Sequence, residues 1–202
     1  MITLYDMDVS GNAQKVRIAL ALLGLDYTRE SPDGAARGST AYRALHPLGQ
    51  VPVLVDGDIS LRDSHAILVY LAAKHRPGDW DGATPQEKAE IAIWLAHAAS
   101  EILHGPALLR LANLFHLDID RTRPQQLTDR ILPLFEAHLQ TRDWLVGDRL
   151  TIADIAAAPY LALAREGDID LDAYPAVVAW TQRLAALPAF PAMPGWAAVE
   201  TA

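Results

Sequence analysis

The sequence predicts an α/β domain followed by an all-helical domain. Over residues 1–75, short apolar strands alternate with helical segments, and an Asp-Gly turn separates two of the strands. From residue 85 onward, apolar residues recur almost entirely at helical spacing. The intervening residues 76–84 contain Pro, Gly and Asp, a composition typical of a linker. We therefore expect the 202 residues to form domains at 1–75 and 85–202, joined by a linker at 76–84.

The first domain opens with a short apolar strand at 2–5 and a polar turn at 8–12. Apolar residues then recur at helical spacing from 13 to 23, and Gly24 is a residue type that commonly ends a helix. A second strand is expected at 26–30, followed by a stretch rich in Gly and Ser. This start is typical of a strand–helix–strand unit.

A hairpin and a helix complete the first domain. Strands at 53–55 and 59–62 flank the turn at 56–58, where Asp-Gly is a hairpin signal. Ser64 can cap a helix that runs to Lys74. The predicted order is strand, helix, strand, helix, hairpin, helix.

The second domain begins with a strong helix start. Thr84 is followed by Pro85 at the first helical position and by Glu87 three residues after the cap. This helix should continue to a break at Gly105-Pro106, and Pro133 should kink a later helix or shift its start. Further helices are expected at about 124–141, 151–165 and 173–187.

Composition excludes several function classes. The chain has 25 acidic and 17 basic residues, a net charge of −8, so a nucleic-acid partner is not expected. It contains no cysteine, so the sulfur for any thiol chemistry must come from a ligand. The first residues lack the pattern of a signal peptide, and no apolar run is long enough for a membrane helix. We expect no membrane partner and a cytoplasmic location.

Gln50-Val51-Pro52 stands at the entry to the hairpin. A proline cannot donate to a sheet ladder, so it belongs at a strand start or an exposed edge. If the X–Pro bond is cis, the Val51 backbone can face a ligand and pair with a peptide as an extra strand. The other interpretation is an ordinary proline at the start of a strand.

Asp63-Ser64 opens a helix, and helix N-termini attract carboxylates. Asp63 could meet an ammonium group while Ser64 and the backbone hold a carboxylate, which together fit an amino-acid head group. The alternative is that Ser64 only caps the helix.

Ser10-Gly11-Asn12 follows the first strand and precedes the first helix. A hydroxyl or amide donor there could lower the pKa of a bound thiol by donating to its thiolate. Capping is again the alternative, because Ser and Asn are preferred N-caps.

Two further patterns favour structural roles. Thr151 and Asp154 have the spacing of a capping box, which is a folding signal. His97, Glu101 and His104 could place metal ligands on one helix face, but a polar face lining a cleft or subunit contact is favoured, and no metal is expected. His46 is interpreted as a loop residue.

Taken together, these motifs resemble the soluble glutathione S-transferase family, bacterial type, over nearly the whole chain. The segments that carry the resemblance, in order, are Ser10-Gly11-Asn12 with Lys15-Val16-Arg17, His46 to Leu54, Leu61 to Ile67 with Tyr70-Leu71, Leu145 to Asp148 with Leu150 to Asp154, and Tyr174-Pro175 with Trp180. The resemblance implies a thioredoxin-like first domain, an all-helical second domain, a homodimer, and glutathione as co-substrate.

The resemblance also implies roles for individual residues. Val51 would pair with the cysteinyl backbone of glutathione beside a cis Pro52, and Gln50 would lie near the glycyl end. Asp63 and Ser64 would hold the γ-glutamyl head. Ser10 matches the serine that stabilises the thiolate in serine-type classes, and Asn12 is a second candidate. Many relatives have Glu where this chain has Asp63, and Ala13 stands where some bacterial relatives have Cys.

The resemblance implies an enzyme that activates the glutathione thiolate to attack a small hydrophobic electrophile. The residues expected to line the electrophile pocket are Trp94, His97, Ala98, Glu101 and Leu108. Two alternatives remain: glutathione-dependent reduction of a disulfide, and a non-catalytic interaction module on the same fold.

Overall fold

Four short strands and four helices form the N-terminal part of the chain. The computed structural model describes residues 1–196. Its first elements are β1 (Ile2–Tyr5), α1 (Gly11–Leu22), β2 (Tyr27–Glu30), α2 (Gly34–Gly38), α3 (Thr40–Leu45), β3 (Val53–Asp56), β4 (Ile59–Arg62) and α4 (Ser64–His75). The strands and helices therefore alternate as predicted, except that two short helices lie between β2 and β3.

The sheet has the strand order β2-β1-β3-β4. β1 is parallel to β2, which requires the crossover through α1, and β3 is antiparallel to both β1 and β4. At its centre Leu4 pairs with Leu54, and both side chains are buried. This mixed sheet, with its helical crossover and C-terminal hairpin, confirms the thioredoxin-like fold of the first domain.

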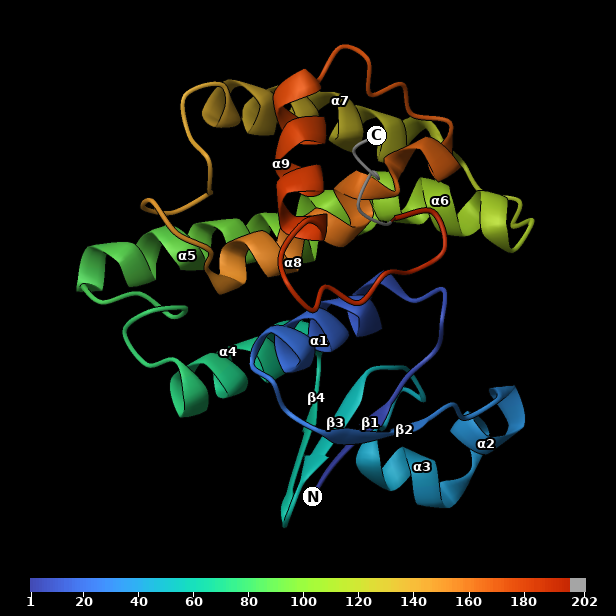
Figure 1. Ribbon diagram of the computed structural model, residues 1–202. Coiled ribbons are helices and arrows are strands. Elements are labelled where there is room, and N and C mark those ends of the chain that lie inside the picture. The colour runs from blue at the N-terminus through green and yellow to red at the C-terminus, as the bar shows by residue number, and fades with distance from the viewer. Residues whose placement is uncertain (197–202) are drawn as a thin grey trace.

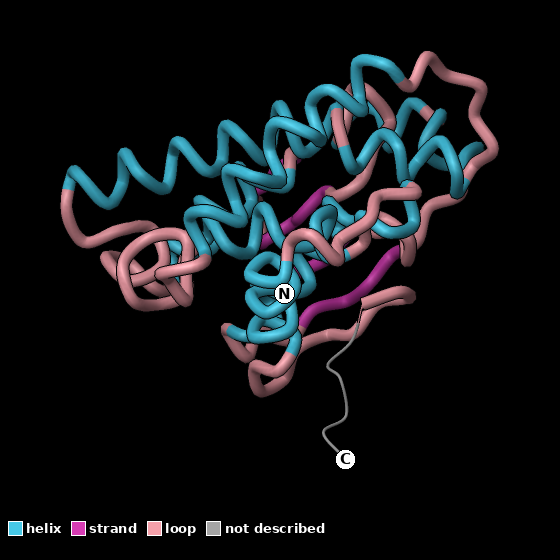
Figure 2. Tube along the Cα trace, turned by 90° about the horizontal axis from the view of Figure 1, so that it is seen from above, coloured by secondary structure: helices cyan, strands magenta, loops and turns pink. Residues whose placement is uncertain are grey.

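Helices α1 and α4 separate the sheet from the rest of the molecule. Apolar side chains such as Val16 and Leu20 on α1 and Ile67 and Leu71 on α4 are fully buried in the core that they share with the sheet. Figure 1 shows both helices between the sheet and the helices that follow, and Figure 2 shows the helical layer from above. Because α1 contacts structure on both sides, it positions residues for both domains.

The remaining described elements are helical, which confirms the all-helical second domain. They are α5 (Pro85–His97), a π-helical turn (Ala98–Ile102), α6 (Pro106–Leu114), α7 (Thr122–Leu139), α8 (Ile152–Ala162), a 3₁₀ turn (Ala164–Gly167) and α9 (Pro175–Ala185). Within residues 1–196, no helix has the length and apolar character needed to cross a membrane.

The helix boundaries differ from the predicted ones in three places. Pro106 begins α6, a helix that was not predicted. Proline can begin a helix because it is well suited to the first helical position. α7 starts at Thr122 and continues through Pro133. α8 ends at Ala162 and gives way to the 3₁₀ turn. The predicted helical domain reaches residue 202, and residues 197–202 lie outside the described part.

Asp154 joins three segments of the helical domain. Its carboxylate accepts hydrogen bonds from Thr151 N–H at 3.0 Å, Leu145 N–H at 2.9 Å and Trp180 Nε1 at 2.9 Å. Thr151 accepts from Ala153 N–H, so the capping box at the start of α8 is present. The carboxylate is fully buried, and the same bonds hold α9 and the loop before α8 in place. The structural interpretation of Thr151 and Asp154 is confirmed.

Candidate active site

A polar groove lies where the N-termini of α1 and α4 approach the loop before β3. Its lining residues are Asn12, His46, Leu48, Gln50, Val51, Pro52, Arg62, Asp63 and Ser64. Six of the seven residues predicted for catalysis and glutathione binding therefore lie together, although they come from three separate stretches of sequence. The seventh, Ser10, lies in an adjoining cavity.

Asp63 caps α4 from an unusual backbone conformation. Its φ of 71° lies in the left-handed region that non-glycine residues rarely adopt. Its Oδ1 accepts hydrogen bonds from His65 N–H at 2.9 Å and from Ala66 N–H at 3.0 Å. Ser64 was predicted to cap this helix, and that prediction is wrong. Asp63 is the N-cap because its carboxylate accepts from two N–H groups of the first turn, and Ser64 is the first helical residue.

Because Ser64 does not cap α4, its hydroxyl is available to the groove. Ser64 is buried, and its hydroxyl donates to Asn12 Oδ1 across 3.4 Å. This bond joins the starts of α1 and α4. Because Oδ1 is the acceptor, the amide nitrogen of Asn12 keeps its N–H donors for other groups.

The Val51 backbone lies at an open edge of the groove. The Val51–Pro52 peptide bond is cis, as expected. Tyr42 Oη donates to the Gln50 carbonyl at 2.8 Å and fixes the chain just before it. Within residues 1–196, the N–H and C=O of Val51 form no hydrogen bond. They can therefore pair with an extended ligand.

Three lining residues were not among the predicted site residues: His46, Leu48 and Arg62. Arg62 ends β4 directly before Asp63. Its position next to Asp63-Ser64 in the sequence could have identified it as a site residue. Burial and the nearby Arg62 guanidinium lower the pKa of His46 below its ordinary value. Its Nδ1 accepts from Leu48 N–H at 3.3 Å, which leaves Nε2 protonated as a possible donor.

Ser10 caps α1 and also lines a second, mostly apolar cavity. Its Oγ accepts from Ala13 N–H at 3.2 Å, so Ser10 is the N-cap of α1. This bond uses a lone pair, and the hydroxyl proton remains free to be donated. The cavity beside it is lined by Met7, Val9, Ser10, Arg110, Leu111, Leu114, Phe115 and Tyr160.

None of the five residues predicted for the electrophile pocket is among these lining residues. Trp94 and Ala98 are buried in the helical core, where the Trp94 ring packs against Phe135 with centroids 4.8 Å apart. The wall next to Ser10 comes instead from α6 and α8. Four of the five predicted residues lie on α5 and the π-helical turn that follows it, and these elements do not line this cavity. Leu108, on α6, is half-buried but lies outside the cavity lining.

His97, Glu101 and His104 do not converge on one point. His97 Nδ1 lies 3.1 Å from Glu101 Oε2, whereas His104 Nδ1 lies 3.0 Å from the Ser100 carbonyl oxygen. The π-helical turn Ala98–Ile102 has more residues per turn than an α-helix, which disturbs the i, i+4, i+7 alignment. In the described part of the chain, no group of three or more potential metal ligands is assembled.

Comparisons with known proteins agree with this arrangement. Residues 4–79 match the family described as Glutathione S-transferase, N-terminal domain, and residues 119–188 match its C-terminal domain. Glutathione S-transferase 4 of Zea mays is 30% identical, covering 93% of this chain and 89% of the relative. The chain belongs to the glutathione S-transferase family.

Two further relatives show the breadth of that family. A crystal structure of a glutathione S-transferase from Xanthobacter autotrophicus is 33% identical, covers 96% of this chain and 98% of that one, and superposes with a TM-score of 0.85. The maleylacetoacetate isomerase of Pseudomonas aeruginosa is 32% identical over 93% of this chain and 92% of its own. The helical domain and the sheet domain of this glutathione transferase are thus both represented among its relatives.

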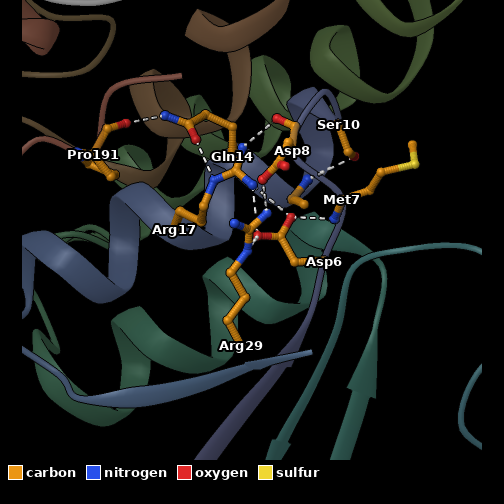
Figure 3. Close-up of polar contacts among 9 residues, drawn as sticks. Asp6, Met7, Asp8, Ser10, Gln14, Arg17, Arg29 and Pro191 are labelled. Atoms are coloured by element: carbon orange, nitrogen blue, oxygen red, sulfur yellow. Dashed lines mark hydrogen bonds and ion pairs between the residues drawn. The ribbon is translucent and has the colours of Figure 1, made fainter. Parts of the chain in front are cut away.

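An ion-pair network centred on the buried Asp6 holds the Ser10 loop of this transferase from the side of the sheet. The fully buried Asp6 carboxylate accepts from Arg17 Nη1 at 2.7 Å and from Arg29 Nε at 2.5 Å. Arg17 Nη2 also donates to the Asp8 carbonyl at 3.1 Å, and Arg29 pairs with the Asp8 carboxylate. Figure 3 shows both arginines in contact with the segment that leads to Ser10.

Gln14 links the same network to the end of the described chain. Its Oε1 accepts from Arg17 Nε at 2.6 Å, and its Nε2 donates to the Pro191 carbonyl at 2.5 Å (Figure 3). The segment after α9 therefore lies against α1. Both sides of the first turn of α1 are fixed by these contacts.

Tyr160 of α8 holds the first turn of α1 from the side of the helical domain. Its ring lies so close to Gly11 that a Cβ there would be 2.6 Å from the ring. Burial raises the pKa of its hydroxyl above the ordinary value, against smaller opposing effects of Arg110 and the Asn12 backbone. A glycine between Ser10 and Asn12 is therefore required by the contact between the domains.

Proposed function

We propose that this transferase binds glutathione in the polar groove and presents its thiolate to the adjoining apolar cavity. The observation that carries the proposal is the Ser64–Asn12 hydrogen bond, because it brings two helix N-termini to one place. Helix N-termini favour anions, and both the γ-glutamyl carboxylate and the thiolate are anions. The groove and the cavity meet at the first turn of α1.

Each end of glutathione has a suitable partner in the groove. The hydroxyl and the backbone N–H of Ser64 would hold the γ-glutamyl carboxylate, and Asp63 would meet its ammonium group. Both cap bonds use Oδ1 of Asp63, which leaves Oδ2 for this role. The cysteinyl backbone would pair with Val51 beside Pro52. Gln50 and the Arg62 guanidinium would hold the glycyl carboxylate.

Ser10 and Asn12 would lower the pKa of the bound thiol. Each can donate one hydrogen bond to the thiolate while its oxygen acceptor is engaged elsewhere. The thiolate would then attack the carbon of a small hydrophobic electrophile held by Leu111, Leu114 and Phe115. Two of these side chains, Leu114 and Phe115, are exposed enough to form the entrance.

The test is a titration of bound glutathione by thiolate absorbance. In the wild type, the thiol should titrate well below free glutathione. Ser10→Ala and Asn12→Ala should each raise that pKa, and Ser60→Ala, an exposed hairpin serine, is the matched control. The mechanism is wrong if neither change at the first turn of α1 moves the titration.

The alternatives give different outcomes in the same preparation. Calorimetry that detects no heat with millimolar glutathione would favour the interaction module. Turnover of hydroxyethyl disulfide but not of chlorodinitrobenzene would favour the disulfide reductase. Maleylacetoacetate is included among the substrates because one relative is named for its isomerisation.

We also propose a homodimer, a division of the chain at residues 75 and 85, and a cytoplasmic location. The division follows the end of α4 at His75 and the start of α5 at Pro85. Support for the dimer is a mostly apolar hollow in which Val69 is 46% exposed. It is lined by Val69, Asp81, Lys88, Ile91, Ala92, Leu95 and Ile152. Light scattering should give twice the chain mass, and Val69→Glu should halve it.

A further inference from the structure

Two side-chain contacts join the neighbouring helices α1 and α4 (Figure 1). Asn12 and Ser64 form the first, and both line the polar groove. Lys15 and His65 form the second, with Lys15 Nζ 3.0 Å from His65 Nε2. Lys15 follows Asn12 by three residues, so both lie on one face of α1, and a helical side chain tilts toward the N-terminus of its helix. The Lys15 ammonium group therefore lies close to the helix N-termini that line the groove.

This ammonium group is enclosed by the protein. Lys15 is only 1% exposed, and its hydrogen-bond partner is an imidazole rather than a carboxylate. A buried charge that has no hydrogen-bonded anion is costly, so such a group gives up its proton readily. Burial lowers the pKa of Lys15 to about 7, and both of its charge states are therefore present near neutral pH. Thiolate stabilisation by Ser10 and Asn12 does not involve this group.

Helices α4 and α8 bring titratable groups to Lys15. From α4 and its cap, Asp63 favours the charged form of Lys15, whereas His65 stays uncharged near pH 7 because its pKa is lowered to about 4, mainly by burial. From α8, the Tyr160 ring lies 5.4 Å from the ammonium nitrogen, and burial raises the pKa of its hydroxyl, which also stays uncharged. The charge of Lys15 is thus balanced mainly by one carboxylate.

The proposed ligand would bring a second carboxylate to the same place. The γ-glutamyl carboxylate would bind at Ser64, the residue before His65, and the ammonium group of the same head would meet Asp63. Ser64 is buried, whereas Asp63 is exposed. The carboxylate would therefore act on Lys15 through the protein interior, while water screens the ammonium group. Protonated Lys15 would stabilise the bound ligand more than neutral Lys15 does.

We propose that Lys15 links glutathione binding to pH, because filling the groove favours its protonated form and one proton is drawn onto its amine from solvent. This proposal rests on the proposed transferase function and adds a regulation of the same groove.

The test uses S-methylglutathione, whose blocked sulfur has no proton to exchange. Calorimetry is repeated in phosphate, Hepes and Tris, which differ in ionisation enthalpy, so the dependence of the heat on the buffer gives the protons taken up per ligand. At about pH 7.5 the wild type should take up at least about 0.3 proton, and Lys15→Met less than about 0.1. Lys15→Met should fold, because it removes a buried charge. Arg142→Met, which removes a charge at an exposed position, should keep the wild-type value.

The same linkage gives the affinity a pH dependence. A group that is protonated more readily in the complex contributes affinity at low pH, and that contribution is lost as pH rises through its pKa. Between about pH 6.5 and 8.5 the Kd of the wild type should rise at least about threefold, and that of Lys15→Met less than about 1.5-fold. A change in packing alone would alter the Kd but not its pH dependence. His46 also lines the groove, but its pKa is lowered by burial and by Arg62, so it titrates at the acid end.

A measurement on the wild type identifies the group that takes up the proton. The ε-carbon signal of a lysine moves when its ammonium group is deprotonated, and Lys15→Met assigns the signal by removing it. In protein labelled at this carbon, the Lys15 signal should titrate at higher pH with S-methylglutathione than without it. The signals of Lys74 and Lys88 should titrate alike in both samples.

The outcomes separate the two proposals. S-methylglutathione that binds without proton uptake, with proton release, or with equal uptake in wild type and Lys15→Met overturns the role of Lys15, and the transferase function stands. A wild type that binds neither glutathione nor S-methylglutathione at millimolar concentration removes both.

Discussion

The ammonium nitrogen of Lys15 lies 3.0 Å from Nε2 of His65, in the space between α1 and α4. Lys15 is fully buried, and burial lowers its pKa to about 7, against a smaller opposing effect of Asp63. The pKa of His65 is lowered to about 4, mainly by burial and to a smaller extent by the Lys15 charge. The Tyr160 ring, 5.4 Å from the ammonium, completes this enclosure from α8.

This pair should give the stability of the protein a specific pH dependence. Between pH 7 and 10.5 the unfolded chain holds the Lys15 proton more tightly than the folded protein, so the free energy of unfolding rises with pH. Lys15→Met should therefore stabilise the protein by about 1–3 kcal/mol at neutral pH, and by less at about pH 9. Urea unfolding at both pH values measures this difference. Arg142→Met, at an exposed position after α7, is the control, and an equal gain from Lys15→Met at both pH values would contradict the assignment.

Gly11→Ala should destabilise the protein through Tyr160. The added Cβ would lie 2.6 Å from a ring that is only 4% exposed, so the ring or the helix must shift. We expect a loss of about 1–3 kcal/mol and a Tm lowered by roughly 3–10 °C. Gly34→Ala, where nothing lies within 4 Å of the added atom, should be neutral.

A second substitution distinguishes this contact from a general helix effect. Tyr160→Leu combined with Gly11→Ala should recover part of the lost Tm relative to the sum of the single variants. Strict additivity would show that the two residues do not interact as described.

Asp63→Asn separates the charge of Asp63 from its structural role. Asn has the same cap acceptor and tolerates positive φ, so thermal stability should change by less than about 1 kcal/mol. Loss of the charge that is proposed to meet the ammonium group should raise the Kd for glutathione at least about fivefold. Calorimetry measures that Kd. Asp63→Ala should lose both stability and affinity, and unchanged affinity in Asp63→Asn would exclude the ammonium role.

Asp154→Asn should strongly destabilise the helical domain. Burial raises the pKa of Asp154 to about 6, while its neighbours all donate hydrogen bonds to it. An amide offers one acceptor atom, so its NH₂ group must face the N–H of Thr151 or of Leu145. We expect a loss of about 2–4 kcal/mol, or roughly 5–15 °C in Tm. Asp148→Asn, at an exposed site in the preceding loop, should be neutral.

The sequence predicted most of the fold because its signals are local. The Asp56-Gly57 turn, the Thr84-Pro85 helix start and the Thr151–Asp154 capping box each act within a few residues. α6 was missed because Pro106 was taken as a helix break, although proline also favours a first helical position. Whether a proline ends one helix or begins another depends on the conformation of the preceding residues, which the sequence pattern does not give.

The grouping of Asn12, Gln50 to Pro52 and Asp63-Ser64 in one groove could be predicted because these residues lie within short motifs, whereas the cavity beside Ser10 could not. Met7 and Val9 meet Leu111 and Tyr160 only after α6 and α8 pack against α1. Their apolar side chains are indistinguishable in sequence from core residues. Asp63 shows a different limit: the positive φ that makes it the cap is set by the turn from β4 into α4, and nothing in its residue type requires it.

The contact between Gln14 and Pro191 has a practical consequence for protein engineering. Because Pro194, a few residues further along, forms part of a cavity wall with Val9 and Arg110, the extended stretch beyond α9 belongs to the working enzyme. Trimming the protein at Ala185, where the last described α-helix ends, would open that wall and free one side of α1 at the same time.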